Sequence, residues 1–160
     1  MKQDRVETFL QQWQQVRPEL DCSPMGVIGR LARAQQLISA RLLPVFKAFN
    51  LSAIEFDILA TLRRADCPLT PTELYQTLMI SSGAMSTRCE QLVQRQLIER
   101  LASGDDRRSC KIALTSIGTT LIDAAVEAHL TNETDILSPL TLDEQQQLAS
   151  LLTRWLVANE

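Results

Sequence analysis

The segment from Pro71 to Thr115 places the strongest limit on how this chain can fold. It contains two short amphipathic helical patterns, at about 71–78 and 82–95, which are joined by a tight turn. Two apolar runs follow at once, separated by the sequence SGDDRRS, and this pattern is typical of a β-hairpin. Only 4% of the residues are aromatic and five are glycine, which favours a helix-rich protein over a β-sandwich or barrel.

Helical patterns also flank this segment on both sides. Three helix starts carry a capping box, in which a hydroxyl residue and a glutamate three residues later satisfy each other's backbone amides. Pro71 stands at a first helical position, where its missing N–H costs nothing. The fold is therefore expected to be mainly α with a small β-hairpin wing. The capping boxes are Ser52–Glu55, Thr70–Glu73 and Thr141–Glu144, and further helices are expected at about 4–16, 26–47, 53–64, 116–135 and 142–157.

The second helix of the central pair has one apolar face and one polar face. Met85, Cys89, Leu92 and Val93 form the apolar stripe, while small, hydroxyl and amide residues face the other way. Such a face can approach a DNA major groove and read base edges, and arginines in a following wing can enter a minor groove. The residues expected to contact DNA are Thr72, Ser82, Gly83, Ser86, Thr87, Gln91, Arg95, Arg107 and Arg108.

The net charge of −3 is unevenly distributed along the chain. Residues 25–115 carry twelve basic and eight acidic groups, a net charge of +4. Residues 116–160 carry one basic and seven acidic groups, a net charge of −6. A mildly basic middle with an acidic end fits a local anion-binding surface.

Several other classes of protein are disfavoured by the sequence. No apolar run approaches the roughly 18 residues that a membrane span needs, and no signal-peptide core is present, so a cytoplasmic protein is expected. The four cysteines form no CxxC pair, and with a single histidine no metal site or cofactor is expected. The chain has no Ser/His/Asp set, P-loop or GxGxxG motif, so it is not expected to be an enzyme. His129, on a helical pattern among alanines, is expected to be exposed or at a subunit interface.

The block LTPTELYQTLMISSGAMSTRCEQLVQRQLIERLASGDDRRSCKIALTSIGTTLI resembles the winged helix-turn-helix domain of the MarR family of bacterial transcriptional regulators. The wing motif Asp106-Arg107-Arg108 and the helix start Leu114-Thr115-Ser116-Ile117-Gly118 carry the resemblance. It implies a single domain over residues 1–160 that forms an obligate homodimer on a palindromic operator in double-stranded DNA. The dimerisation helices would lie in residues 1–48 and 116–160, and the DNA-binding region in residues 52–115.

A narrower resemblance joins the N-terminal segment FLQQWQQVRPELDCSPMGVIGRLARA to the urate-responsive subgroup of that family, which has an extra first helix. The resemblance implies a repressor that a small molecule releases from DNA: urate, a related purine or a phenolic anion. Its ligand pocket would contain Trp13, Asp57, Arg88 and Arg100, and a planar anion suits stacking on tryptophan and bidentate contact from arginine. Each residue also has a structural interpretation: Trp13 as a core anchor, Asp57 as an ion-pair partner and Arg100 as an ordinary strand residue.

Two alternative functions stay open from the sequence. Cys22 lies near the position of a reactive cysteine in peroxide-sensing members of the same family, so the trigger could be an oxidant. The neighbouring Asp21 disfavours a thiolate there, because like charges repel. The chain could also be a winged-helix protein-interaction module without a ligand, although Arg107 and Arg108 favour DNA.

Overall fold

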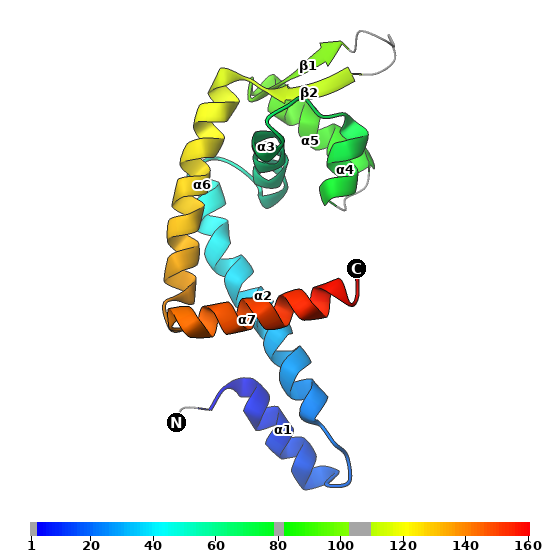
Figure 1. The fold of residues 1–160 in the computed structure, drawn as a ribbon, viewed down its shortest axis with the longest axis vertical. Coiled ribbons are helices and arrows are strands. Elements are labelled where there is room, and N and C mark those ends of the chain that lie inside the picture. The colour runs from blue at the N-terminus through cyan, green and yellow to red at the C-terminus, as the bar shows by residue number, and fades with distance from the viewer. Residues whose placement is uncertain (1–2, 79–81, 103–109) are drawn as a thin grey trace. The chain divides into compact units, whose positions relative to one another are not determined.

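The structure is a computed structural model that describes residues 3–78, 82–102 and 110–160, and it divides into two compact units, residues 1–41 and 42–160. The first unit consists of α1 (Arg5–Val16) and the N-terminal part of α2 (Ser23–Ala48), which lie side by side (Figure 1). Arg30 of α2 donates hydrogen bonds to Asp4 and Glu7 at 2.8 and 3.0 Å. Gly29 permits the close approach, because a Cβ there would lie 3.1 Å from Val6 Cγ1.

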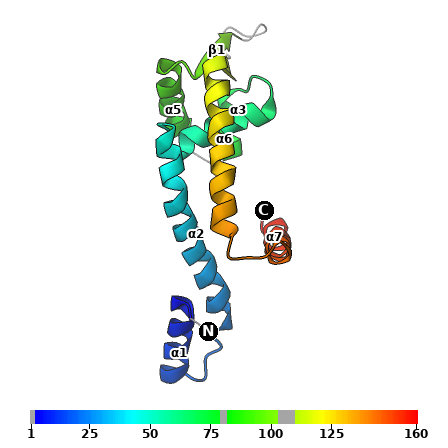
Figure 2. The same ribbon diagram turned by 90° about the vertical axis from the view of Figure 1, so that its left-hand side faces the viewer.

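The second unit contains the last turns of α2 and all the later elements. Helix α6 (Ser116–Leu137) packs against α3 (Ala53–Ala65), and Arg63 Nε donates to Asp123 Oδ1 across that contact at 2.7 Å (Figure 2). The elements are α3 (Ala53–Ala65), α4 (Pro71–Leu78), α5 (Ser82–Gln94), β1 (Ile98–Ala102), β2 (Cys110–Leu114), α6 (Ser116–Leu137) and α7 (Leu142–Val157).

A single apolar core joins α3, α4, α5, the hairpin and α6. Strands β1 and β2 pair antiparallel from Ile98 opposite Leu114 to Ala102 opposite Cys110, and Leu69 exchanges two backbone hydrogen bonds with Ile112 on the free edge of β2. Each of these elements therefore contributes at least one fully buried side chain to the same core. The largest of them are Ile58, Leu59, Leu74, Met85, Leu92, Ile98, Ile112 and Ile122.

The junction between β2 and α6 explains why threonine and glycine stand three positions apart there. Thr115 caps α6 by accepting the N–H of Gly118 at 3.0 Å, and its hydroxyl donates to the Gln96 carbonyl at 2.7 Å. The first turn of α6 presses against the turn before β1, so that a Cβ on Gly118 would lie 1.9 Å from the Leu97 carbonyl oxygen. Only glycine fits at that contact without a backbone shift.

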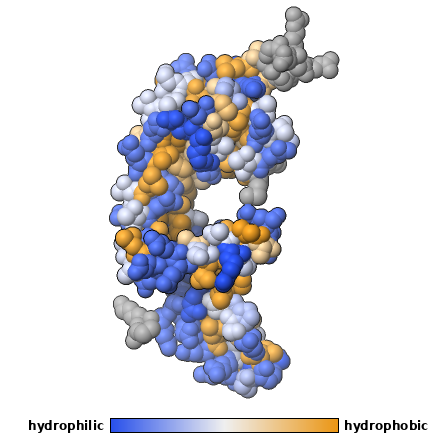
Figure 3. Space-filling view, viewed as in Figure 1, coloured by the Kyte–Doolittle hydropathy of each residue, from blue (hydrophilic) through white to orange (hydrophobic). Residues whose placement is uncertain are grey.

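Helix α7 differs from the core elements because none of its residues is buried. Leu151 and Trp155 are 55% and 54% exposed, and Figure 3 shows apolar side chains at the surface in the regions of α7 and α1. Among the described residues, no single helix is long and apolar enough to cross a membrane, although the bent pair α2 and α3 meets that test by length and composition alone. The described residues also contain no group of three or more side chains suited to a metal ion.

The expected fold class is confirmed, and the element boundaries agree closely with the expected ones. Each of the three capping boxes forms. The largest difference is at the start of α2, which begins at Ser23 rather than near residue 26, because Asp21 accepts hydrogen bonds from the Ser23 N–H and hydroxyl. Pro44 lies inside α2, which continues to Ala48, and α6 extends to Leu137.

Candidate nucleic-acid interface

Helix α5 presents a polar face to solvent and an apolar face to the core, as the sequence predicts. Met85, Cys89 and Leu92 are 1%, 2% and 0% exposed, and the spacing between them keeps them on one side of the helix. The Cys89 thiol belongs to the core, where burial raises its pKa above the usual value, although the charge of Arg100 acts in the opposite direction. The exposed residues of α5 are Gly83, Ser86, Thr87, Glu90, Gln91 and Gln94.

Gly83 and Thr87 form the outward side of the first turns of α5. A Cβ on Gly83 would meet no atom within 4 Å, so internal packing does not require glycine at this position. The absence of a side chain leaves backbone groups open to an approaching partner. Thr87 donates its hydroxyl hydrogen to the Gly83 carbonyl at 3.2 Å, which leaves the hydroxyl oxygen free to accept.

Helix α4 and the hairpin frame this surface. Thr72 is exposed in the first turn of α4, which begins at a capping box between Thr70 and Glu73. Hydrogen bonds from the Thr70 backbone and hydroxyl lower the pKa of the Glu73 carboxyl, and the charge of Lys111 on β2 adds to that effect. Residues 79–81, the side chain of Ser82 and the wing residues 103–109, with Arg107 and Arg108, lie outside the described part of the chain.

The described arginines around α5 all have partners within the protein. Arg88 Nη1 donates to Gln91 Oε1 at 3.0 Å, and Arg100 Nη2 donates to Glu90 Oε2 at 2.9 Å. Arg95 points toward the protein, where Nη1 donates to Glu55 Oε1 at 3.3 Å and Nη2 donates to the Asn50 carbonyl at 2.8 Å. That Arg95 contacts DNA stays a prediction.

Asp57, Arg88 and Arg100, the three candidate ligand residues of the second unit, have different partners within it. Asp57 is exposed, yet burial of its surroundings raises the pKa of its carboxyl, and the charges of Arg64 and His129 oppose this rise. Among the described residues, neither Arg88 nor Arg100 is one of the charges that shift this pKa. Asp57 and Glu55 therefore lie on different sides of α3, and Glu55 is the carboxylate that faces α5.

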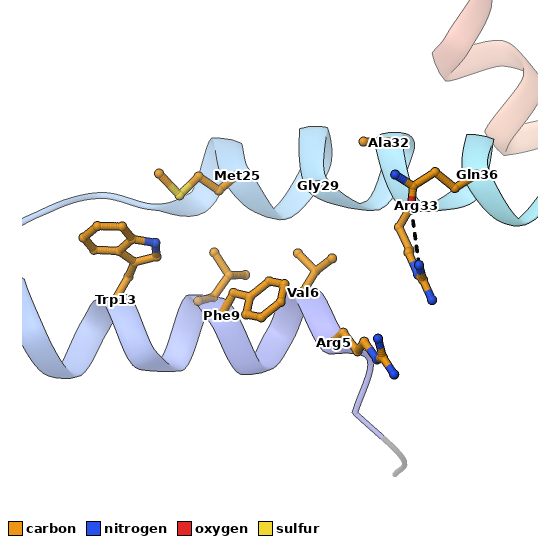
Figure 4. Close-up of a pocket in the computed structure, with 10 residues that line it drawn as sticks. Arg5, Val6, Phe9, Trp13, Met25, Gly29, Ala32, Arg33 and Gln36 are labelled. Atoms are coloured by element: carbon orange, nitrogen blue, oxygen red, sulfur yellow. Dashed lines mark hydrogen bonds between the residues drawn. The ribbon is translucent and has the colours of Figure 1, made fainter.

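Trp13 belongs to the first unit, where the residue is 41% exposed. It lies on the wall of a groove of about 520 Å³ between α1 and the start of α2 (Figure 4). Phe9 and Met25 lie beside the tryptophan, and Arg5 and Arg33 border the other end of the groove. The exposure shows that Trp13 is not a buried core anchor within this unit. The groove is lined by Arg5, Val6, Phe9, Leu10, Trp13, Met25, Gly29, Ala32, Arg33 and Gln36.

His129 is largely covered within one copy of the chain, which corrects the first of the two expectations from the sequence, that it is exposed; a place at a subunit interface stays a prediction. Its side chain is 16% exposed, and its ring lies 5.6 Å from that of Phe46 and 4.9 Å from that of Phe56. Nε2 lies 3.1 Å from Glu133 Oε1, and Nδ1 has no hydrogen-bond partner among the described residues. Sequence reasoning missed this cluster because Phe46 and Phe56 lie far from His129 along the chain.

A helix-turn-helix whose second helix exposes hydroxyl and amide groups, followed by a two-stranded hairpin, defines a winged-helix DNA-binding protein. A model of the MarR family matches residues 49–109. The transcriptional regulator PecS of Dickeya dadantii is 44% identical over 151 residues, which cover 93% of this chain and 91% of PecS. The MarR protein of Escherichia coli is 30% identical over 131 residues, which cover 79% of this chain and 89% of MarR.

Solved structures agree with these sequence comparisons. A variant of E. coli MarR in complex with operator DNA superposes with a TM-score of 0.72 at 25% identity, covering 90% of this chain and 97% of that one. An organohalide-sensing regulator bound to 2,4-dichlorophenol has the same fold, with a TM-score of 0.74 at 19% identity over 87% of this chain and 82% of that one. The chain belongs to the MarR family, and it is a DNA-binding transcriptional regulator rather than an enzyme.

Proposed function

We propose that this regulator is a homodimeric repressor that leaves a palindromic operator when a small planar anion of the urate type binds. The observation that carries the ligand part of the proposal is the exposure of Trp13 on the extra first helix, where it lines an apolar groove. An aromatic anion would gain stacking on the indole ring and charge-assisted hydrogen bonds from guanidinium groups.

A second copy of the chain is the occupant that best suits the uncovered helices. Helix α7 has no buried residue, and α2 exposes large apolar side chains such as Val27 and Ile28, which are 62% and 58% exposed. Side chains of this kind gain about 1.5–3 kcal/mol each when they are fully buried, so burial of these helices between two copies would stabilise a dimer. Residues 1–48 and 116–160 are therefore proposed as the dimerisation segments.

The dimer would present two α5 helices to successive major grooves of the operator. The exposed face with Gly83, Ser86, Thr87 and Gln91 would meet base edges and phosphates, and Thr72 of α4 would contact the backbone. Arg107 and Arg108 of the wing would reach a flanking minor groove. E. coli MarR is known in complex with operator DNA, which supports this arrangement.

The proposed effector site uses Trp13 for stacking and Asp57, Arg88 and Arg100 for polar contacts. Asp57 is exposed, so its carboxylate is accessible to the N–H groups of a purine. Arg88 and Arg100 are each held by a side chain of α5, so a ligand that draws them away would disturb the helix that reads DNA. The ligand would then release DNA because it binds the form of the dimer that does not fit the operator more tightly.

A gel-shift titration on the DNA upstream of the chain's own gene tests this proposal. Urate, xanthine, salicylate and peroxide are compared for release of DNA and for thermal stabilisation of the protein. Trp13→Ala is expected to raise the urate concentration for half release by about 3- to 10-fold, because a stacking contact is lost. Val16→Ala, on the same helix and 68% exposed, is the control and should leave it unchanged.

If urate neither stabilises the wild-type protein nor releases DNA, the proposed effector is wrong and the DNA-binding function is unaffected. Release by peroxide that disappears in Cys22→Ser would instead favour the oxidant-sensing alternative. The comparisons support a DNA-binding regulator over a protein-interaction module, and steep loss of binding with added salt would agree with phosphate contacts.

A further inference from the structure

Glu55 is an unusual carboxylate in this protein because it is buried. It is only 7% exposed, and the described residues include one other buried polar side chain, that of Thr61. Its Oε2 accepts hydrogen bonds from the Ser52 N–H and hydroxyl, both at 2.7 Å, which completes the capping box of α3. Its Oε1 is directed to Arg95 at the end of α5, 40 residues further along the chain.

The other two capping boxes show that a cap does not need this second contact. Glu73 and Glu144 make the same hydrogen bonds with Thr70 and Thr141, and both glutamates are exposed at the surface. Among the described residues, neither of these glutamates forms an ion pair with an arginine. The burial of Glu55 and its contact with Arg95 therefore have a purpose beyond starting a helix.

The two groups compensate each other's burial. Burial raises the pKa of the Glu55 carboxyl, but the hydrogen bonds from Ser52 and the charges of Arg95 and Arg88 together lower it by more. The pKa is therefore below its usual value. Glu55 is thus ionised at neutral pH and needs a cation beside it. The pair is also the least exposed of the described arginine ion pairs, with side chains 30% and 9% exposed for Arg95 and Glu55.

Arg95 also joins the end of α5 to the turn that follows α2. Its Nη2 donates to the Asn50 carbonyl at 2.8 Å, and Asn50 has a left-handed backbone with φ of 54° in the turn between α2 and α3. One guanidinium therefore joins the end of α5 to the first turn of α3 and to the turn that follows α2. The planar fork of arginine suits such a double contact, which an ammonium group makes less well.

We propose that Glu55 and Arg95 form a positioning pair for DNA recognition, which fixes the C-terminal end of α5 on the turn between α2 and α3. Arg95 then acts through Glu55 and Asn50 and does not contact a phosphate. A change in the angle of α5 at this end would displace the exposed groups of its first turns, where DNA is expected. The proposal rests on the DNA-binding function and is independent of the identity of the effector.

Measurements of operator affinity against salt concentration distinguish this role from a direct contact. Arg95→Ala, Arg95→Lys and Glu55→Gln are compared with wild type by fluorescence anisotropy, at a temperature at which thermal unfolding shows every variant to be folded. The proposal predicts that each variant binds the operator about tenfold more weakly, with an unchanged slope of log K against log salt. Because the two residues act as a unit, the double variant should be no weaker than the weaker single variant.

A phosphate contact by Arg95 predicts a different set of results. Arg95→Ala would then reduce the magnitude of the salt slope by about 1.8 for a dimer, Arg95→Lys would bind nearly as well as wild type, and Glu55→Gln would leave affinity unchanged. Glu144→Gln is the matched control, since it alters an exposed capping box with no arginine. A purely structural role would lower the melting temperature of the Glu55 and Arg95 variants without weakening operator binding by the folded protein. Either of these results would overturn the proposal.

Discussion

The apolar core of this regulator, in α3, α4, α5, the hairpin and α6, and its helical arms, which are α1, the N-terminal part of α2 and α7, use apolar residues in opposite ways. In the core, Ile58 and Leu59 of α3 have no exposed surface, and α5, the hairpin and α6 each contribute a fully buried side chain. In α7 no residue is buried, and Phe9 of α1 is 56% exposed. The core therefore buries its apolar side chains within one copy, whereas in the proposed dimer the arms would bury theirs against a second copy.

The largest expected effect is in the core. Leu92→Ala should lower the free energy of unfolding by about 4 kcal/mol, because Leu92 is fully buried and the cavity can close only in part. Leu151→Ala on α7, where Leu151 is 55% exposed, should lower the free energy of unfolding of the separated protomer by less than about 0.5 kcal/mol. Urea denaturation at a protein concentration below the dissociation constant of the dimer measures both free energies. Equal losses in the two variants would contradict a core that is complete in one copy.

Gly83 near the start of α5 and Gly118 in the first turn of α6 provide a second matched pair. Gly118→Ala should cost about 3 kcal/mol of stability, because the added Cβ would lie 1.9 Å from the Leu97 carbonyl oxygen. Gly83→Ala should keep or slightly raise stability, since open space surrounds that position and alanine favours a helix by up to about 1 kcal/mol. Thermal unfolding compares the two. Operator affinity should fall in Gly83→Ala, and a normal affinity there would place the DNA contact elsewhere on α5.

An intermediate effect is expected where the arms meet a second copy. Leu151→Asp should weaken the dimer by about 30-fold, or about 2 kcal/mol, because it places a charge in the proposed apolar interface. Sedimentation velocity over a range of protein concentrations measures the change. Asp143→Asn, in the exposed first turn of α7, is the control for altered charge on the same helix. An unchanged dimer in Leu151→Asp would exclude this face of α7 from the interface.

The sequence predicted the order of elements well because that order depends on local signals. Capping boxes, helical periodicity and the hairpin pattern act within a few residues of each other, and the structure confirms them. The partners of Arg95 and His129 could not be predicted in the same way. A helical wheel gives the direction of a side chain but not the distant residue that it meets, such as Glu55 for Arg95 or Phe46 for His129.

The Thr115–Gly118 motif lies between these two cases. Its resemblance to a family pattern identified it from the sequence, but the physical reason for glycine is the Leu97 carbonyl at the turn before β1. The candidate effector residues show the same limit more strongly. Each of them was assigned to the site by resemblance alone. The charges that act on the pKa of Asp57 are those of Arg64 and His129, whereas the carboxylate that faces α5 is that of Glu55.

The smallest expected effect concerns pH and has opposite signs in the two regions. Burial raises the pKa of Asp57, so the folded protein binds this proton more tightly than the unfolded chain, and the ionised carboxylate destabilises the fold at neutral pH. Asp57→Asn should therefore raise the melting temperature at pH 7 by less than about 2 °C. The gain should shrink as the pH falls through the raised pKa and stay constant below the unfolded value of 3.8.

Asp4 in the first unit should respond in the opposite direction. Hydrogen bonds from the Glu7 backbone and from Arg30 lower its pKa, so its ionised form stabilises the fold above the unfolded pKa and this stabilisation is lost as pH falls through the folded pKa. Asp4→Asn should thus lower the melting temperature at neutral pH and have no effect in strong acid. Differential scanning calorimetry of both variants between pH 3 and pH 7.5 measures the two curves. Curves of the same sign would show that Asp57 is ion-paired in solution like Asp4, and would remove the distinction between a carboxylate held in place by the fold and one left accessible to a ligand.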